Sequence, residues 1–186
     1  MENYLSHIAD QTSTKFRPAM TNTFRVTIPG LAGLVDKVSE EEGAVIGEDA
    51  ETVLKVSNED FKEPTLSQQS VTITRGNLKM EFPAQMEAFS STMNFSCFID
   101  ADTYGKLYAW KCLSGDHETG VVGDPTEYWR TVTIEHLTGK GELIGTWTLP
   151  NCWVSSLEGV TFDNNSANIK KVGITLKYFR PTYRKA

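Results

Sequence analysis

One short stretch has residue types that could hold a calcium ion: Asp100-Ala-Asp102-Thr-Tyr104-Gly105. An EF-hand loop begins with acidic oxygens at alternate positions, continues through a glycine and ends on a bidentate glutamate. In this chain Tyr104 stands at the third oxygen position, and Lys111 stands where the glutamate is required. An ammonium group cannot ligate a cation, so the spacing excludes a calcium loop. The acids have a simpler interpretation, in which Asp100 ends a strand and Asp102 is the N-cap of a helix.

No other group of residues in the sequence indicates catalysis or metal binding. Thr138-Gly-Lys-Gly141 lacks the spacing of a phosphate-binding loop and is typical of a hairpin turn. The histidines do not pair with each other or with a cysteine at metal-ligand spacing: His7, His117 and His136. The three cysteines form no C-x-x-C pair and predict buried, reduced thiols in a cytosolic protein: Cys97, Cys112 and Cys152. We therefore expect no enzyme, no metal and no cofactor.

Charge is distributed unevenly along this chain, whose net charge is −6. Residues 36–51 contain seven acids and one base, whereas residues 164–186 contain six bases and no acid. Such blocks are usually solvated, but opposite blocks on neighbouring copies can also attract each other in an assembly.

The chain has no apolar run long enough for a transmembrane helix, and its first residues lack a secretory signal pattern. We therefore expect no membrane insertion.

Short strands are the elements expected to dominate the chain. Apolar and polar residues alternate with the period of a half-buried strand in eight segments: 23–28, 52–57, 70–74, 78–82, 93–99, 130–137, 142–149 and 171–179. A helix is expected at about 102–114, ending before Gly115. The sequence thus predicts a mainly β protein, an antiparallel sandwich or barrel with one flanking α-helix and extended arms and loops.

The clearest prediction is a β-hairpin over residues 70–82, turned by Arg75-Gly-Asn77. One face of this hairpin is apolar and is expected to pack inside the sandwich: Val71, Ile73, Leu78, Met80 and Phe82. The predicted helix has an apolar face formed by Tyr104, Leu107, Tyr108 and Cys112. Trp110 and Leu113 lie off this face, so they pack either in the core or against a neighbouring subunit.

The remaining segments define the expected domain organisation. Residues 1–22 are polar and form an N-terminal arm. Residues 23–186 form one β domain with an acidic loop insertion at about 31–51 and a basic C-terminal tail.

Taken in order, four segments resemble the tail tube proteins of contractile-tailed bacteriophages, which stack as hexameric rings and are related to secretion-system and pyocin tube proteins. The resemblance rests on FRPAMTNTFRVTIPG (16–30), SVTITRGNLKMEF (70–82), NFSCFIDADTYGKLYAWKCLSG (94–115) and NIKKVGITLKYF (168–179). The acidic stretch 31–51 departs from the family pattern, so a tube-initiating or baseplate ring protein and a secretion-system tube protein remain alternatives.

The resemblance implies a self-assembling structural protein of the inner tail tube, a conduit for DNA during infection. It implies a place in the virion tail, after assembly in the host cytoplasm. Its partners would be further copies of itself, the tail sheath, the baseplate and tail terminator proteins, and double-stranded DNA passing transiently through the lumen. Polar strand residues would face this lumen: Thr72, Thr74, Lys79, Glu81, Lys171, Thr175 and Lys177. Contacts between subunits or rings would use Glu40, Glu41, Glu42, Glu48, Asp49, Arg180, Arg184, Lys185, Trp110 and Leu113.

A monomeric carbohydrate- or peptide-binding β-sandwich is the competing class. It would also have alternating strands, together with exposed aromatic residues such as Trp129, Trp147 and Trp153, which could equally be core. An enzyme on such a sandwich has no residue constellation in its favour. Ring formation at raised concentration distinguishes the tube protein from the binding module.

Overall fold

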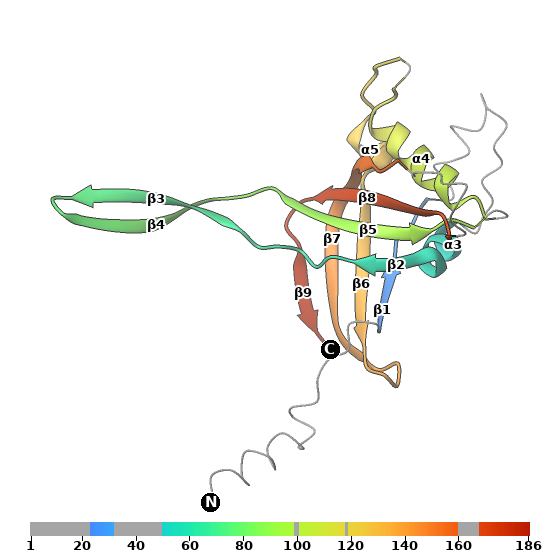
Figure 1. The fold of residues 1–186 in the computed structure, drawn as a ribbon, viewed down its shortest axis with the longest axis horizontal. Helices are drawn as coiled ribbons and strands as arrows, with labels where there is room; N and C mark the ends of the chain where they lie inside the picture. Colours follow the sequence, from blue (N-terminus) through green and yellow to red (C-terminus); the bar gives the residue numbers. More distant parts are fainter. Residues whose placement is uncertain (1–22, 32–49, 99–100, 118, 160–167) are drawn as a thin grey trace, which may run out of the picture.

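A computed structural model describes residues 23–31, 50–98, 101–117, 119–159 and 168–186 (Figure 1). Its elements follow the chain in the order β1 (Phe24–Thr27), α3 (Ala50–Ser57), β2 (Asn58–Phe61), β3 (Gln68–Arg75), β4 (Leu78–Met86), β5 (Phe89–Ser96), α4 (Thr103–Ser114), α5 (Pro125–Tyr128), β6 (Arg130–Leu137), β7 (Leu143–Leu157), β8 (Lys171–Tyr178) and β9 (Thr182–Lys185). The predicted mainly β character is confirmed.

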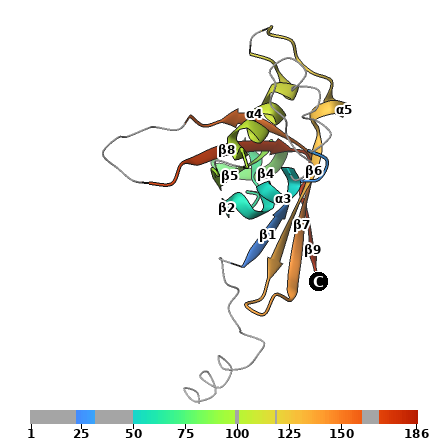
Figure 2. The same cartoon turned by 90° about the vertical axis from the view of Figure 1, so that its right-hand side faces the viewer.

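Strand β7 belongs to two sheets and connects them. Its first part pairs with β6 and β9, giving a first sheet in the order β1-β6-β7-β9. Its last part pairs with β8, giving a second sheet in the order β7-β8-β5-β2. Both views show the strands of the first sheet leading away from β2, β5 and β8 (Figures 1 and 2). Every pairing is antiparallel, as the sequence predicts.

The core lies between the two sheets because each strand directs alternate side chains inward. The buried side chains that fill it include Val26, Met93, Phe95, Val132, Ile134, Leu149, Val154, Val172, Ile174 and Leu176. Apolar residues face each other across the strands, as Met93 does with Ile174 and Phe95 with Val172. A slip of one residue would expose them all, so burial fixes the register of the second sheet.

Helix α4 has a different buried face from the one that the sequence indicated. Its buried residues are Thr103, Lys106, Leu107, Ala109 and Trp110. Trp110 is 1 % exposed, and its indole Nε1 donates to the carbonyl oxygen of Tyr128 at 2.9 Å. The expected subunit contact at Trp110 is therefore corrected to a core position, because a side chain enclosed by its own chain offers no surface to a neighbour. Leu113 packs against the core and is half-buried.

Residues 52–57 form most of α3 and not the predicted strand. Ala50, Leu54 and Ser57 are buried, with the spacing of one helical face, whereas Val56 is 70 % exposed. The prediction of a strand failed because a segment this short fits both the strand and the helix period. The described residues thus include a second helix of two turns beside α4, and residues 50–51 of the stretch expected to be an acidic loop belong to it.

We predict that the effect of Gly105→Ala on stability depends on residue 102. Asp102 caps α4, since its Oδ1 accepts a hydrogen bond from the backbone N–H of Gly105 at 3.1 Å. A Cβ on Gly105 would overlap that carboxylate, so the substitution should displace the cap and cost about 1 kcal/mol. In an Asp102→Ala background the same substitution should stabilise by roughly 0.5–1 kcal/mol, because alanine is the better helix former. Urea denaturation of the four proteins measures both effects, and stabilisation in both backgrounds would contradict the prediction.

Candidate functional site

The β3–β4 hairpin has one polar and one apolar face. Directly opposed residues are Thr72 with Glu81 and Thr74 with Lys79, so these four side chains share the polar face. The apolar pairs Val71 with Phe82 and Ile73 with Met80 alternate with them, and Leu78 on the same face lies opposite Arg75. Gly76 has φ 59°, the left-handed conformation that a tight hairpin turn requires. The predicted hairpin and its division into two faces are present.

The apolar face of this hairpin is not covered by the described part of the chain. The hairpin forms a two-stranded sheet of its own and extends away from the sandwich (Figure 1). Val71 is 52 % exposed, Ile73 46 % and Phe82 47 %. The expectation that this face packs inside the sandwich is therefore wrong, because the strands leave the body before these residues are reached. A pair of strands with exposed apolar side chains is typical of a surface that a partner covers.

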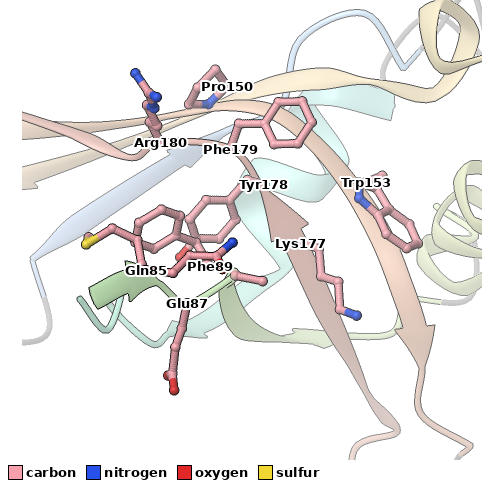
Figure 3. A pocket seen from close by; sticks show the side chains of 11 residues that line it. Gln85, Glu87, Phe89, Pro150, Trp153, Lys177, Tyr178, Phe179 and Arg180 are labelled. Carbon is pink, nitrogen blue, oxygen red and sulfur yellow. The ribbon is translucent and has the colours of Figure 1, made fainter. Parts of the chain in front are cut away.

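Hydrogen bonds hold the base of the hairpin, where an open groove begins. Ser67 Oγ donates to Glu87 Oε2 at 2.5 Å, and Gln68 Nε2 donates to the carbonyl oxygen of Ala84 at 2.8 Å. The groove has a volume of about 770 Å³, and Figure 3 shows the side chains that line it. Its lining is Gln85, Met86, Glu87, Ala88, Phe89, Pro150, Trp153, Lys177, Tyr178, Phe179 and Arg180. Met86 belongs both to this groove and to strand β4, so the groove begins where the hairpin leaves the sandwich.

The second sheet has a polar outer face that includes three of the predicted lumen residues. Lys171 and Lys177 are exposed and Thr175 is half-exposed, whereas the residues between them in β8 are buried. Lys171 Nζ lies 2.5 Å from Glu59 Oε2 on β2, and Ser96 Oγ also donates to that carboxylate. These hydrogen bonds, that from Lys171 first, lower the pKa of Glu59.

Two of the basic residues near the C-terminus lie on a strand. Arg184 and Lys185 are exposed on β9, which pairs only with β7 and forms an edge of the first sheet. Arg180 is exposed at the rim of the groove. Charged residues on an edge strand oppose uncontrolled pairing with other strands. The acids expected to attract these bases lie outside the described residues: Glu40, Glu41, Glu42, Glu48 and Asp49. So do Asp100 and the arm 1–22.

The three tryptophans considered for ligand binding are half-buried and pack on other aromatic rings. Ring centres lie 5.5 Å apart for Trp129 and Phe179, 5.1 Å for Trp147 and Tyr183, and 6.4 Å for Trp153 and Tyr128. Each ring therefore has an aromatic neighbour within its own chain, a contact that also stabilises the fold.

The described residues contain no group of three or more histidines, cysteines, aspartates or glutamates arranged to hold a metal ion. Among the same residues, no helix has the length and hydropathy needed to cross a bilayer.

Comparison with known proteins gives the class of this fold. No family model matches the chain. The fold is similar to a chain of the sheath-tube complex of the PVC extracellular contractile injection system, with a TM-score of 0.65 and 19 % identity over 94 % of this chain and 99 % of that one. It is also similar to a chain of the anti-feeding prophage tube-terminating cap, with a TM-score of 0.64 and 19 % identity over 91 % and 93 %. The chain therefore shares its fold with chains of these two assemblies.

A curated relative makes the resemblance more specific. The tail tube protein of Serratia phage KSP90 is 22 % identical over 119 residues, which are 63 % of this chain and 67 % of the relative. The resemblance to phage tail tube proteins that the sequence indicated is confirmed.

Proposed function

We propose that this chain is a structural protein that assembles into stacked hexameric rings and forms the inner tube of a contractile tail. The observation that carries the proposal is the β3–β4 hairpin, which has exposed apolar side chains and two edges with which no other described strand pairs. An isolated two-stranded sheet of this kind is only marginally stable in water. Neighbouring copies would bury its apolar side chains and pair with the backbone groups at its edges. The named relatives, a tail tube protein and a sheath-tube complex, support the same function.

Ring closure would use the edges of the second sheet. This sheet ends at β2 on one side and at the last part of β7 on the other. Copies that join these edges in a closed ring would form a continuous barrel without free edges. The polar face of the sheet would then line the lumen with Lys171, Thr175 and Lys177, and the hairpin would contribute Thr72, Thr74, Lys79 and Glu81.

Further partners follow from the tube function. The tail sheath would surround the tube, and baseplate and terminator proteins would hold its two ends. Double-stranded DNA would pass transiently through the lumen, which a wall without strong net positive charge favours. Contacts between stacked rings would use the arm 1–22 and the acidic residues 36–51, with Arg180, Arg184 and Lys185 as partners of opposite charge. The assembled protein would reside in the virion tail, after assembly in the host cytoplasm.

Negative-stain microscopy of the purified chain at increasing concentration tests this function. We expect ring-shaped particles with a central hole, and stacks of rings at the highest concentrations. Light scattering should show a mass that increases with concentration. A chain that stays monomeric at every concentration would contradict the proposal.

A further inference from the structure

The two lysines on the polar face of the second sheet both contact groups on that same face. Lys171 Nζ lies 2.5 Å from Glu59 Oε2, and Lys177 Nζ lies 5.9 Å from the ring centre of Trp153. The side chain of Lys171 is 58 % exposed and that of Glu59 is 30 % exposed. The pair is therefore at the surface, where anything in contact with this face would meet it.

An irregularity in β2 places two successive acids on this face. Neighbouring residues in a regular strand point to opposite sides of a sheet. The pairing of β2 with β5 shifts between Asn58 and Asp60, which is the effect of a bulge. As a result Glu59 reaches Ser96 and Lys171, while both carboxylate oxygens of Asp60 accept hydrogen bonds from Asn94 Nδ2 at 3.0 and 2.9 Å.

The two acids differ in what they hold. Glu59 binds a cation, so its carboxylate neutralises an ammonium group that a phosphate would otherwise bind. Asp60 accepts hydrogen bonds from the uncharged amide of Asn94, so these contacts leave its negative charge on the face and neutralise no lysine. A third carboxylate, that of Glu158, lies over Gly173 beside Asn94, where a Cβ would overlap it. Glu158 therefore adds a further negative charge to this face, over a residue two positions along β8 from Lys171.

We propose that Glu59 prevents Lys171, and with it the polar face of the second sheet, from binding a polyanion such as double-stranded DNA. The inference rests on the proposed function, in which this face lines the channel. A free lysine that binds a phosphate releases a counterion and gains affinity, whereas a lysine already paired with a carboxylate gains little. The channel wall could then contact passing DNA without binding it tightly.

Binding of a short fluorescent DNA duplex to the unassembled chain tests the assignment, with anisotropy measured over a range of salt concentrations. Glu59→Gln and Asp60→Asn are matched variants, because each removes one negative charge from the same strand and face. Only Glu59→Gln releases a lysine. We expect Glu59→Gln to bind more tightly and to have a salt dependence steeper by about 0.9 logarithmic units, the value of one phosphate contact. A fourfold increase in salt should then lower its affinity by a factor about 3.5 times larger than the factor for Asp60→Asn.

Two further variants keep the assignment testable. Glu59→Gln combined with Lys171→Gln should restore the weak binding and shallow salt dependence of the native chain. Glu59→Asp shortens the acid without changing net charge, and it should act in the same direction as Glu59→Gln if the latter folds poorly by circular dichroism. Equal binding by Glu59→Gln and Asp60→Asn would overturn the assignment. Ring formation is measured separately by microscopy. An absence of rings would contradict the tube proposal, whereas equal DNA binding by the two variants would contradict only the role of Glu59.

Discussion

Ile73→Asp is expected to weaken ring formation strongly while leaving the chain folded. Ile73 lies on the apolar face of the hairpin opposite Met80 and is 46 % exposed, so the isolated chain loses little when it is replaced. In a ring the same side chain would be covered by a neighbour, and an unpaired carboxylate buried there costs several kcal/mol. We expect the concentration needed for rings to rise roughly a hundredfold or more, since about 1.4 kcal/mol corresponds to a factor of ten.

Thr74→Asp is the matched control for this substitution. It introduces the same residue at the next position of the same strand, on the polar face opposite Lys79. Any loss of strand propensity is therefore shared, and only the face differs. Rings should form from Thr74→Asp at close to the native concentration, as sedimentation and microscopy would show. Equal loss of rings in both variants would mean that the hairpin assembles through its backbone edges and not through its apolar face.

Trp110→Ala is expected to have the largest effect on stability. The indole is 1 % exposed and donates to the carbonyl oxygen of Tyr128 at 2.9 Å. Removal of a buried tryptophan typically lowers the free energy of unfolding by about 3–5 kcal/mol. This is a large part of the total free energy of unfolding of most domains. Trp110→Phe keeps most of the buried area but loses the hydrogen bond, and its effect should be intermediate.

Tyr108→Ala is the control on the same helix, since Tyr108 is 38 % exposed. Its cost should be about 1 kcal/mol, because a half-covered ring contributes less burial. Urea denaturation followed by circular dichroism measures all three variants. If Tyr108→Ala cost as much as Trp110→Ala, the buried face of α4 would be assigned wrongly.

The sequence predicted those elements whose patterns are local. The β6 strand was expected at 130–137 and is Arg130–Leu137, and the alternation of β8 was equally clear. The two faces of the hairpin were also correctly divided, because the register of a tight turn follows from its residues. Where the hairpin lies could not be predicted, since an apolar face looks the same whether the chain itself or another copy covers it.

Helix α4 shows how a charged residue hid the true core face. Lys106 is 7 % exposed, and its Nζ donates to the carbonyl oxygen of Ala101 at the start of the helix. The apolar spacing indicated a face of Tyr104, Leu107, Tyr108 and Cys112 and left Trp110 open between the core and a neighbouring subunit. A lysine is typical of a solvent face, so Lys106 gave no sign that its side of the helix is buried. Strand β2 was missed for a related reason. Its sequence, Asn-Glu-Asp-Phe, has no alternation, because the bulge places two acids on one face.

Strand β7 gives the subunit a mechanical property. Its 15 residues run through both sheets, so a force on one sheet reaches the other along covalent backbone. Among the described residues, the short strands β1 and β9 pair on one side only, through four residue pairs each. Under tension we expect these edges to peel away pair by pair, while β7 is loaded in shear along its length. A tube built from such subunits would be stiff along the path of β7 and compliant at its edges.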